Sequence, residues 1–351
     1  MTAPLPASLS GAMAFLLTCI LIPPIRRICA RWKLYDSPGP LKIHSVPIPR
    51  LGGVAIAAGL AISAGVFSIA NRAATPSWPF FAALCLIWAA GLIDDLRKLS
   101  PGTRMAAQII AALILWSGGW RLPVFASGVL GFVAIGIFVV LFTNAFNFLD
   151  GSDGLAAGVA CVIALAYIAL PTGMESEFGR VIASCLLGSC AGFLLFNFPP
   201  ANIFMGDSGS TVLGFVISYL ALDFFRPSGP PLSPATMSFP FLVAALPLLD
   251  AALAVLRRLL NRGSMVKGDR RHFYDLALAR GWPARKVLLV SMGISAAFSV
   301  TASACLQCSP AQAMLLAALG AIALLVWMVR LGSLRAGEES RQQVEGVRLQ
   351  E

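Results

Sequence analysis

Evenly spaced polar side chains stand at the junction of two long apolar stretches of this chain. Asn144, Asn147, Asp150 and Asp153 follow one another at intervals of three residues, with no lysine or arginine among them. On a helix this spacing forms one stripe, although the glycines that follow both aspartates predict a break there. Carboxylates near hydrocarbon are costly, and carboxylate and amide oxygens are ligands for Mg²⁺. We therefore expect a functional site here; a polar turn between two membrane helices is the structural alternative.

Two further acidic groups stand at the ends of apolar runs. Asp94 and Asp95 end the third run, and neighbouring residues of a helix point about 100° apart, so the two carboxylates need not share one task. A divalent cation would relieve their repulsion, as would salt bridges to Arg97 and Lys98. Asp207 lies between two glycines in FMGDSGS, where it could begin a helix that binds phosphate or simply serve as its N-cap.

Cationic side chains suited to phosphate groups come from two other segments. The first is KIHSVPIPRLGG before the second apolar run, with Lys42 and His44. The second is the basic loop 257–286, which contains Arg270, Arg271 and His272. Together they suit a diphosphate and sugar pocket, although basic residues at a membrane surface also act as topology anchors or lipid contacts.

One more acidic side chain, Asp250, lies inside the ninth apolar run. A buried aspartate needs a partner, and we favour structural pairing over catalysis for it. The chain contains no GxSxG motif, no Walker A motif and no histidine-rich zinc set. The five polar clusters instead supply the carboxylates and amides of a magnesium site, with basic groups for phosphates.

The composition is that of an integral membrane protein. The 351 residues are 58% hydrophobic and 12% charged, with a mean hydropathy of +0.82, whereas soluble domains carry about 25% charged residues. Long apolar runs predict an all-α membrane protein rather than a β-barrel. We expect about eleven transmembrane helices, near residues 7–28, 51–71, 78–94, 104–119, 123–143, 154–172, 179–197, 209–227, 236–257, 286–306 and 311–330.

The basic residues predict the orientation of these spans. Only four of the 26 lysines and arginines fall on one side, namely Arg72, Arg121, Arg180 and Arg226. The positive-inside rule then places the N-terminus outside, the C-terminus in the cytoplasm, and all five polar clusters on the cytoplasmic face. The net charge of +10 is thus a topology signal and not a sign of nucleic-acid binding. We expect one membrane catalytic domain, residues 1–330, and a polar cytoplasmic tail, residues 331–351.

An ion-coupled transporter is the rival from another functional class. It would use Asp250, Asp150 and Asp153 near the bilayer midplane, between two related halves of the chain. No repeat is visible in the sequence, and most carboxylates gather at one membrane face. Both observations favour an enzyme.

Four motifs carry a resemblance to a known family. KIHSVPIPRLGG, GLIDDL, NAFNFLDGSDGLA and FMGDSGS stand in this order within about residues 36–286. They resemble the signatures of the polyprenyl-phosphate N-acetylhexosamine-1-phosphate transferases, in particular the undecaprenyl-phosphate N-acetylglucosamine-1-phosphate branch. The family includes the enzymes that start O-antigen, enterobacterial common antigen and teichoic acid synthesis, and the phospho-N-acetylmuramoyl-pentapeptide transferase.

The resemblance implies a reaction and a place for it. Undecaprenyl phosphate would attack the β-phosphate of a UDP-N-acetylhexosamine, with Mg²⁺ (Mn²⁺ as an expected substitute), and UMP would leave. This would be the first membrane step of a cell-envelope polysaccharide such as lipopolysaccharide O-antigen, on the cytoplasmic face of the inner membrane. The prenyl chain would lie in a groove open to the bilayer, and the family leaves room for a homodimer.

The resemblance also implies roles for the residues above. Asp207 and Asn147 would bind the metal. Asp94 and Asp95 would act on the lipid phosphate and the metal, with Asp94 orienting or deprotonating the attacking phosphate. Asp150 and Asp153 would bind the nucleotide or position the pyrophosphate. The substrate-binding residues would be Lys42, His44, Asn144, Arg270, Arg271 and His272.

One motif departs from the family pattern. The fifth motif usually has two or three histidines, but DRRHFYD keeps only His272, with Tyr274 and Asp275 at the other positions. Because this motif is associated with the sugar nucleotide, the donor stays open between UDP-N-acetylglucosamine, UDP-FucNAc, UDP-QuiNAc and UDP-MurNAc-pentapeptide.

Overall fold

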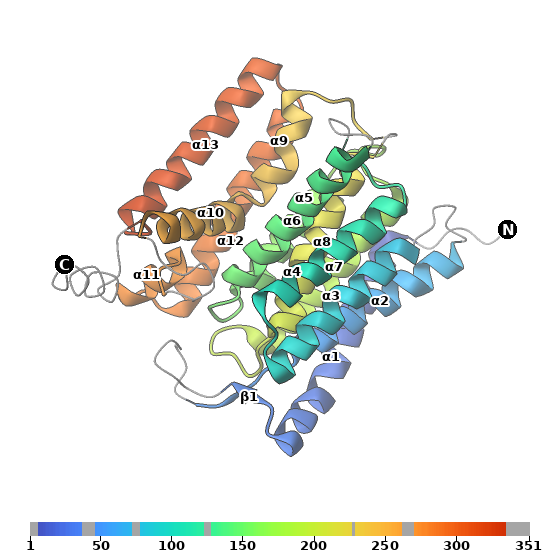
Figure 1. Cartoon of the computed structure of the whole chain (residues 1–351), viewed down its shortest axis with the longest axis vertical. Coiled ribbons are helices and arrows are strands. Elements are labelled where there is room, and N and C mark those ends of the chain that lie inside the picture. The colour runs from blue at the N-terminus through green and yellow to red at the C-terminus, as the bar shows by residue number, and fades with distance from the viewer. Residues whose placement is uncertain are drawn as a thin grey trace.

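The chain folds almost entirely into helices. The computed structural model describes residues 6–36, 46–71, 78–122, 128–226, 229–261 and 270–334. Within these ranges the helices are α1 (Ala7–Trp32), α2 (Gly52–Ala70), α3 (Trp78–Arg97), α4 (Pro101–Ser117), α5 (Gly128–Leu149), α6 (Leu155–Ile168), α7 (Glu177–Asn197), α8 (Asp207–Phe224), α9 (Pro234–Val243), α10 (Ala245–Leu260), α11 (Phe273–Ala279), α12 (Ala284–Cys305) and α13 (Pro310–Arg330). Helices α1 to α8 form one bundle, and α9, α12 and α13 stand beside it (Figure 1).

The helices confirm a multi-pass membrane protein. In the described ranges, seven helices are long and apolar enough to cross a bilayer, namely α1, α2, α3, α5, α7, α12 and α13. The pair α9 and α10 makes an eighth candidate as one bent span. Each of the eleven expected runs contains a helix. Helix α4, with 17 residues, and α6, with 14, are however shorter than the seven helices named above. The count of eleven and the orientation in the membrane stay predictions.

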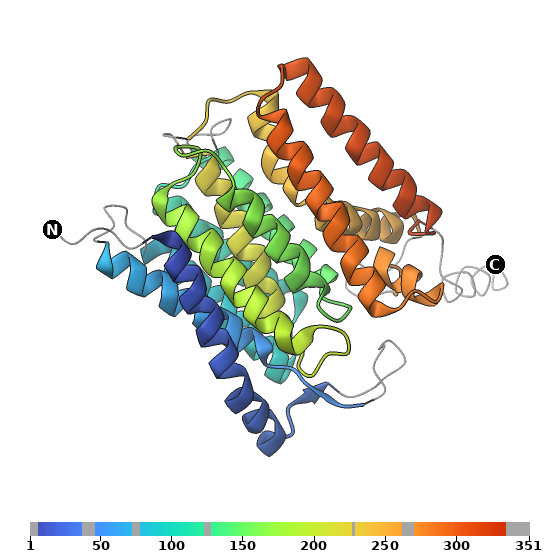
Figure 2. The same cartoon turned by 180° about the vertical axis from the view of Figure 1, so that it is seen from behind.

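The bend between α9 and α10 has a local cause. The two helices meet at Ala244 and are inclined to each other by 77°. Pro247 lacks an amide proton, and its ring clashes with the carbonyl four residues earlier. That carbonyl belongs to Val243, where α9 ends. The bend turns α10 across the direction of α9 and α12, as both views show (Figure 2).

Helix α8 is the core of the bundle. Every residue from Ser208 to Phe224 is buried, and α2, α3, α5, α6 and α7 all pack against it. Glycines let the neighbours come close to its first turn. A Cβ added to Gly53 of α2 would lie 2.1 Å from the amide nitrogen of Gly209, and one added to Gly91 of α3 would lie 2.6 Å from the carbonyl oxygen of Asp207. The start of α8 is therefore enclosed by backbone on two sides.

Backbone hydrogen bonds next to a short sheet connect two of the signature motifs at the same end. Strands β1 (Tyr35–Asp36) and β2 (Ile48–Pro49) pair antiparallel. Next to β2, the amide of Phe204 donates to the carbonyl of Pro49, at 2.7 Å, and the amide of Gly52 donates back to the carbonyl of Phe204, at 2.9 Å. The segment before α8 is thus held against the start of α2.

The last described residues pack against the helices. The Arg280 guanidinium donates to the carbonyl of Leu331, at 2.9 Å, and Arg257 donates to the carbonyl of Ser333. Residues 331–334 belong to the expected tail, and its remainder, residues 335–351, lies outside the described ranges.

Candidate active site

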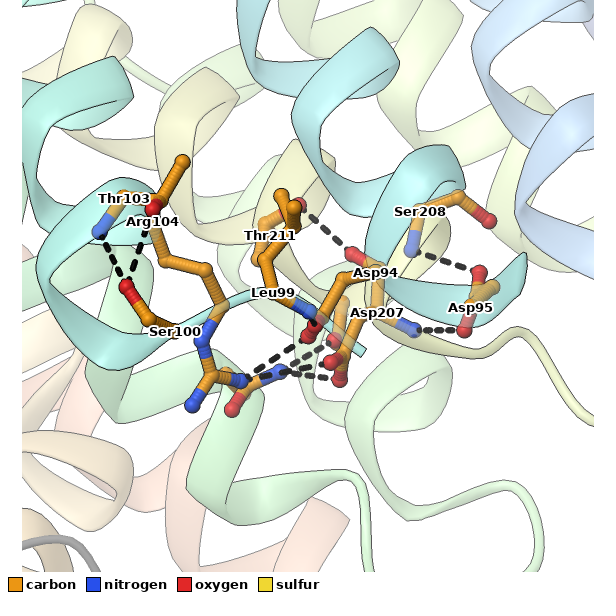
Figure 3. Close-up of polar contacts among 11 residues, drawn as sticks. Asp94, Asp95, Leu99, Ser100, Thr103, Arg104, Asp207, Ser208 and Thr211 are labelled. Atoms are coloured by element: carbon orange, nitrogen blue, oxygen red, sulfur yellow. Dashed lines mark hydrogen bonds and ion pairs between the residues drawn. The ribbon is translucent and has the colours of Figure 1, made fainter. Parts of the chain in front are cut away.

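The first residue of α8, Asp207, is the centre of a polar cluster (Figure 3). Gly206 before it has φ +69°, a conformation that favours glycine and turns the chain into the helix. The Asn147 side-chain amide, from the last turn of α5, donates to Asp207 Oδ1 at 2.8 Å and to the hydroxyl of Ser210 at 3.0 Å. The two residues predicted to bind metal are therefore in direct contact, although they are 60 positions apart in the sequence.

Asp95 holds the start of α8 in place. Its Oδ1 accepts a hydrogen bond from the amide of Asp207, at 2.9 Å, and its Oδ2 accepts one from the amide of Ser208, at 3.0 Å. The first amides of a helix have no partner within the helix, and a carboxylate there also interacts favourably with the helix dipole. This geometry gives Asp95 a positioning contact, while its predicted catalytic role stays a prediction.

Arg104, from the first turn of α4, joins the two other carboxylates. Its Nη1 donates to Asp94 Oδ2 at 3.0 Å and to Asp207 Oδ2 at 3.4 Å. Asp94 also accepts from the amide of Leu99, which closes the turn between α3 and α4. The carboxylates of α3 and α8 thus converge on one cationic nitrogen. Ser100 caps α4 by accepting from the amide of Thr103, at 3.1 Å, and so positions the helix that carries Arg104.

The evenly spaced polar residues of the first motif separate into different environments. Helix α5 ends at Leu149, so the stripe holds for Asn144 and Asn147 and breaks at the glycines, as expected. Asn144 lies one turn deeper, where its amide donates to Gln108 of α4, at 2.9 Å. Asp153 accepts from the amide of Ala201, at 3.0 Å, and holds the loop that leads to α8.

Asp150 lies in the turn after α5, close to the other carboxylates. Burial raises its pKa well above the usual range, and the negative charges of Asp207, Asp95 and Asp153 raise it further. Four acidic groups therefore share one region in which the ionised form of Asp150 is disfavoured. A bound cation would reverse that preference, because it would stabilise the carboxylates that now repel one another.

The basic loop motif reaches the same region through α11. Its first-turn residue Tyr274 donates from its hydroxyl to the carbonyl of Phe148, at 2.9 Å. His272 lies over the ring of Phe148, with centroids 5.6 Å apart, and its Nδ1 contacts Asp250. Asp250 thus has the structural partner that we expected. The motif and the last turn of α5 are in direct contact.

The remaining predicted substrate-binding residues are placed in part. Arg270 forms an ion pair with Asp275, at 3.5 Å. Burial raises the pKa of Asp275, and the positive charges of His272 and Arg270 oppose that rise. Arg271 contributes its carbonyl, which accepts from Arg257 at 3.2 Å. Lys42 and His44 lie outside the described residues.

The donors around Asp207 suit a magnesium ion completed by a substrate. No group of three or more histidine, cysteine, aspartate or glutamate side chains in the described ranges is arranged to hold a metal by itself. Mg²⁺, however, commonly binds through one or two carboxylates, waters and substrate phosphates. The carboxylates of Asp94 and Asp207 already converge on one cationic atom, and Asn147 adds an amide. The residues fit a site of this kind.

Comparison with known proteins decides the family. Residues 77–225 match the sequence profile of Glycosyl transferase family 4. Over 82% of this chain and 82% of its own length, a Bacillus subtilis protein named probable undecaprenyl-phosphate N-acetylglucosaminyl 1-phosphate transferase is 33% identical. The chain belongs to the polyprenyl-phosphate N-acetylhexosamine-1-phosphate transferase family.

Two other members of this transferase family show how broad the similarity is. The decaprenyl-phosphate N-acetylglucosaminephosphotransferase of Mycobacterium tuberculosis is 30% identical over 81% of this chain and 78% of its own length. The phospho-N-acetylmuramoyl-pentapeptide-transferase of Moorella thermoacetica is 31% identical over 79% of this chain and 91% of its own length. The resemblance seen in the four motifs is thereby confirmed over most of the chain.

Sequence reasoning about this transferase missed one residue of the cluster. The sequence places Arg104 only among the basic residues that predict the orientation, because nothing in its local sequence separates it from Arg97 or Lys98. The one available signal is its place in the first turn of a helix that directly follows Asp94 and Asp95. A guanidinium there can turn back toward the preceding helix end.

Proposed function

We propose that this chain transfers N-acetylglucosamine 1-phosphate from UDP-N-acetylglucosamine to undecaprenyl phosphate and releases UMP. The observation that carries the proposal is the contact of Asp94, Arg104, Asn147 and Asp207 at the start of α8. This contact brings together three of the family's signature motifs. Each of the four residues has a side chain suited to phosphate or to its counter-ion.

The bond changes follow from the substrates. A phosphate oxygen of undecaprenyl phosphate forms a bond to the β-phosphorus of the donor. The bond from that phosphorus to the oxygen bridging to the α-phosphate breaks, and this oxygen leaves with UMP. The lipid product is undecaprenyl diphosphate linked to N-acetylglucosamine. Phosphoryl transfer of this type depends mainly on positioning and on neutralising the negative charge that develops.

The residues of the cluster divide this task. Asp94 orients the attacking phosphate, or accepts its proton where it is protonated. Arg104 lies between Asp94 and Asp207 and supplies positive charge where the phosphates of donor and acceptor meet. Asp95 fixes the backbone of Asp207 through two amides. Asp150 and Asp153 would bind the nucleotide or position the pyrophosphate, next to the basic motif of α11.

A divalent cation completes the proposed site. Asp207 and Asn147 would hold Mg²⁺, Asp94 would act on the lipid phosphate and the metal, and Mn²⁺ would substitute. When bound, the ion neutralises phosphate charge and polarises the phosphoryl group.

The donor and the place of the reaction are part of the proposal. Relatives named for N-acetylglucosaminyl phosphate transfer, from Bacillus subtilis and Mycobacterium tuberculosis, favour UDP-N-acetylglucosamine over UDP-MurNAc-pentapeptide. The positive-inside distribution of lysine and arginine favours a site on the cytoplasmic face of the inner membrane. The product would begin a cell-envelope polysaccharide such as O-antigen.

A donor panel tests this proposal. Purified protein in liposomes that contain undecaprenyl phosphate would be given UDP-N-acetylglucosamine, UDP-FucNAc, UDP-QuiNAc or UDP-MurNAc-pentapeptide, with Mg²⁺ or with EDTA. We expect UMP release with UDP-N-acetylglucosamine, and none with EDTA or without the lipid. UMP release with another donor alone would contradict the donor assignment. No release with any donor, from protein that is still folded, would contradict the proposed function.

A further inference from the structure

Asp250 of α10 makes two contacts that the reaction above does not use. Its carboxylate Oδ2 lies 2.5 Å from Nδ1 of His272, and its Oδ1 accepts from the amide of Phe273 at 3.1 Å. The side chain is buried, with 2% of the residue exposed. One carboxylate of α10 thus anchors both the imidazole of His272 and the backbone at the start of α11.

The contact determines where the imidazole carries a proton. A neutral imidazole has one N–H and one nitrogen lone pair, and the protonated form has two N–H groups. A lone pair on Nδ1 would face the carboxylate oxygen and be repelled. Nδ1 therefore carries the proton and donates it to Asp250 in either charge state of the ring, so the contact fixes both the tautomer and the orientation.

Aromatic rings hold His272 from other directions. It is stacked on Tyr274, with centroids 5.5 Å apart and an interplanar angle of 5°. The His272 ring also packs against the ring of Phe148, whose carbonyl accepts a hydrogen bond from the Tyr274 hydroxyl. Phe148 stands directly between Asn147 and the turn that carries Asp150. The imidazole therefore packs against the last turn of α5, which also carries Asn147, although it comes from a different loop.

We propose that Asp250 is a positioning residue that fixes the orientation and the Nδ1 proton of His272, and through it the binding of the sugar-nucleotide donor. The orientation follows from the contacts of Asp250. The consequence for the donor rests on the proposed function. The corresponding motif of the family usually has more histidines. In this chain the one histidine of the motif, His272, is paired with the carboxylate of Asp250 in α10 and is stacked on Tyr274.

Nitrogen-15 spectroscopy tests the orientation without activity. The chain has two histidines, so the signal that disappears in His272→Gln protein identifies His272. In ¹⁵N-histidine-labelled protein in membranes we expect a protonated, strongly hydrogen-bonded Nδ1 that changes in Asp250→Asn and is retained in Asp250→Glu. The matched control is Asp223→Asn, since Asp223 is also buried, 4% exposed, at the far end of α8. An Nδ1 signal unchanged by Asp250→Asn would overturn the proposal.

A double-variant cycle tests the consequence for the donor. Because a hydrogen bond to a charged group is lost, Asp250→Asn should lower kcat/KM for the donor about 10- to 100-fold. The KM for undecaprenyl phosphate should stay within about twofold, and Asp250→Glu should recover part of the loss. If Asp250 acts through His272, adding Asp250→Asn to His272→Gln should cause no further loss.

These experiments distinguish the positioning role of Asp250 from the proposed transferase function. Losses that multiply in the double variant would show that Asp250 acts independently of His272, against the proposal. If no UDP-sugar is a substrate, the proposed function fails, while the nitrogen-15 result still decides the role of Asp250. If Asp250→Asn does not fold, the Asp250→Glu protein takes its place. We expect the protonated Nδ1 signal to be retained in Asp250→Glu, and loss of that signal would contradict the proposed orientation.

Discussion

The amide of Asp207 donates to a carboxylate oxygen of Asp95, 2.9 Å away, and this hydrogen bond joins the end of α3 to the beginning of α8. The other oxygen of Asp95 accepts from the next amide, so the pair behaves as a side-chain cap supplied by a different helix. The carboxylate of the preceding residue, Asp94, forms an ion pair with Arg104 instead. Two adjacent aspartates therefore have two separate tasks.

The first prediction concerns Asp95→Asn. An amide group in place of one oxygen would face a backbone N–H, and the lost contact should destabilise the protein by about 1–3 kcal/mol. Displacement of Asp207 should lower kcat roughly 10²-fold. Thermal unfolding in detergent and UMP release measure the two effects. Asp223→Asn is the control, because Asp223 also accepts from a backbone amide, that of Ser176, at 2.9 Å; it should lower stability alone. Equal loss of activity in both variants would contradict a role specific to Asp95.

The second prediction concerns the charge of Arg104. This guanidinium is 3.0 Å from Asp94 and 3.4 Å from Asp207, and an opposite charge so close shifts a carboxylate equilibrium by about one pKa unit or more. Arg104→Gln should therefore tighten Mn²⁺ binding about tenfold, measured by electron paramagnetic resonance, while kcat falls. Arg97→Gln, at the exposed last residue of α3, should change neither. Weaker Mn²⁺ binding in Arg104→Gln would show that the arginine does not oppose the cation.

The third prediction concerns the close approach of Gly151 and Tyr274. A Cβ on Gly151 would lie 2.0 Å from the tyrosine hydroxyl, so Gly151→Ala must displace the ring that stacks on His272. We expect kcat/KM for the donor to fall about 10²-fold. Adding Tyr274→Ala should cost little more, because the same contact is already lost. Gly136→Ala, in α5 with nothing within 4 Å of the added Cβ, should behave as wild type. Losses that multiply would mean that the two residues act separately.

The fourth prediction concerns Glu175, in the loop before α7, away from the acidic cluster. Burial raises its pKa to about 7; nearby Asp223 raises it as well, while Arg180 and Arg226 lower it. The folded protein thus retains a proton that the unfolded chain loses near pH 4.3. The stability linked to this group is complete below that pH and is lost as the pH rises through about 7.

Glu175→Gln imitates the protonated form and should remove this pH dependence. Its melting temperature should match that of the wild type near pH 4 and exceed it by a few degrees above pH 7. Glu177→Gln, an exposed neighbour, should follow the wild-type pH profile. A Glu175→Gln curve parallel to the wild type at every pH would show that Glu175 does not titrate in this range.

The composition of the cluster was largely predictable from the sequence, because it depends on residue types. A carboxylate or an amide next to an apolar run has few structural reasons to be there, so Asp94, Asn147 and Asp207 stood out. Their convergence was expected because the positive-inside rule places the ends of two of these apolar runs and the start of a third on one membrane face. The contact between Asn147 and Asp207 agrees with this expectation.

The pairing of these groups was less predictable. Asp250 and His272 are 22 residues apart, and their contact joins α10, which is bent away from α9, to the start of α11. Hydropathy does not reveal such a bend, since Val243 and Pro247 both lie within one apolar run. Arg104 was hidden for a different reason, because every basic residue at this membrane face fits the positive-inside pattern equally well.

The central claim is that Asp207 and its neighbours perform the transfer, and formation of the lipid product tests it most directly. Wild-type protein and Asp207→Asn, in liposomes with undecaprenyl phosphate, UDP-N-acetylglucosamine and Mg²⁺, would be analysed by mass spectrometry of the extracted lipid. We predict undecaprenyl-diphospho-N-acetylglucosamine in amounts equal to the UMP released by the wild type, and about 10²- to 10³-fold less from a folded Asp207→Asn protein. Product formation by Asp207→Asn at the wild-type rate would contradict the account.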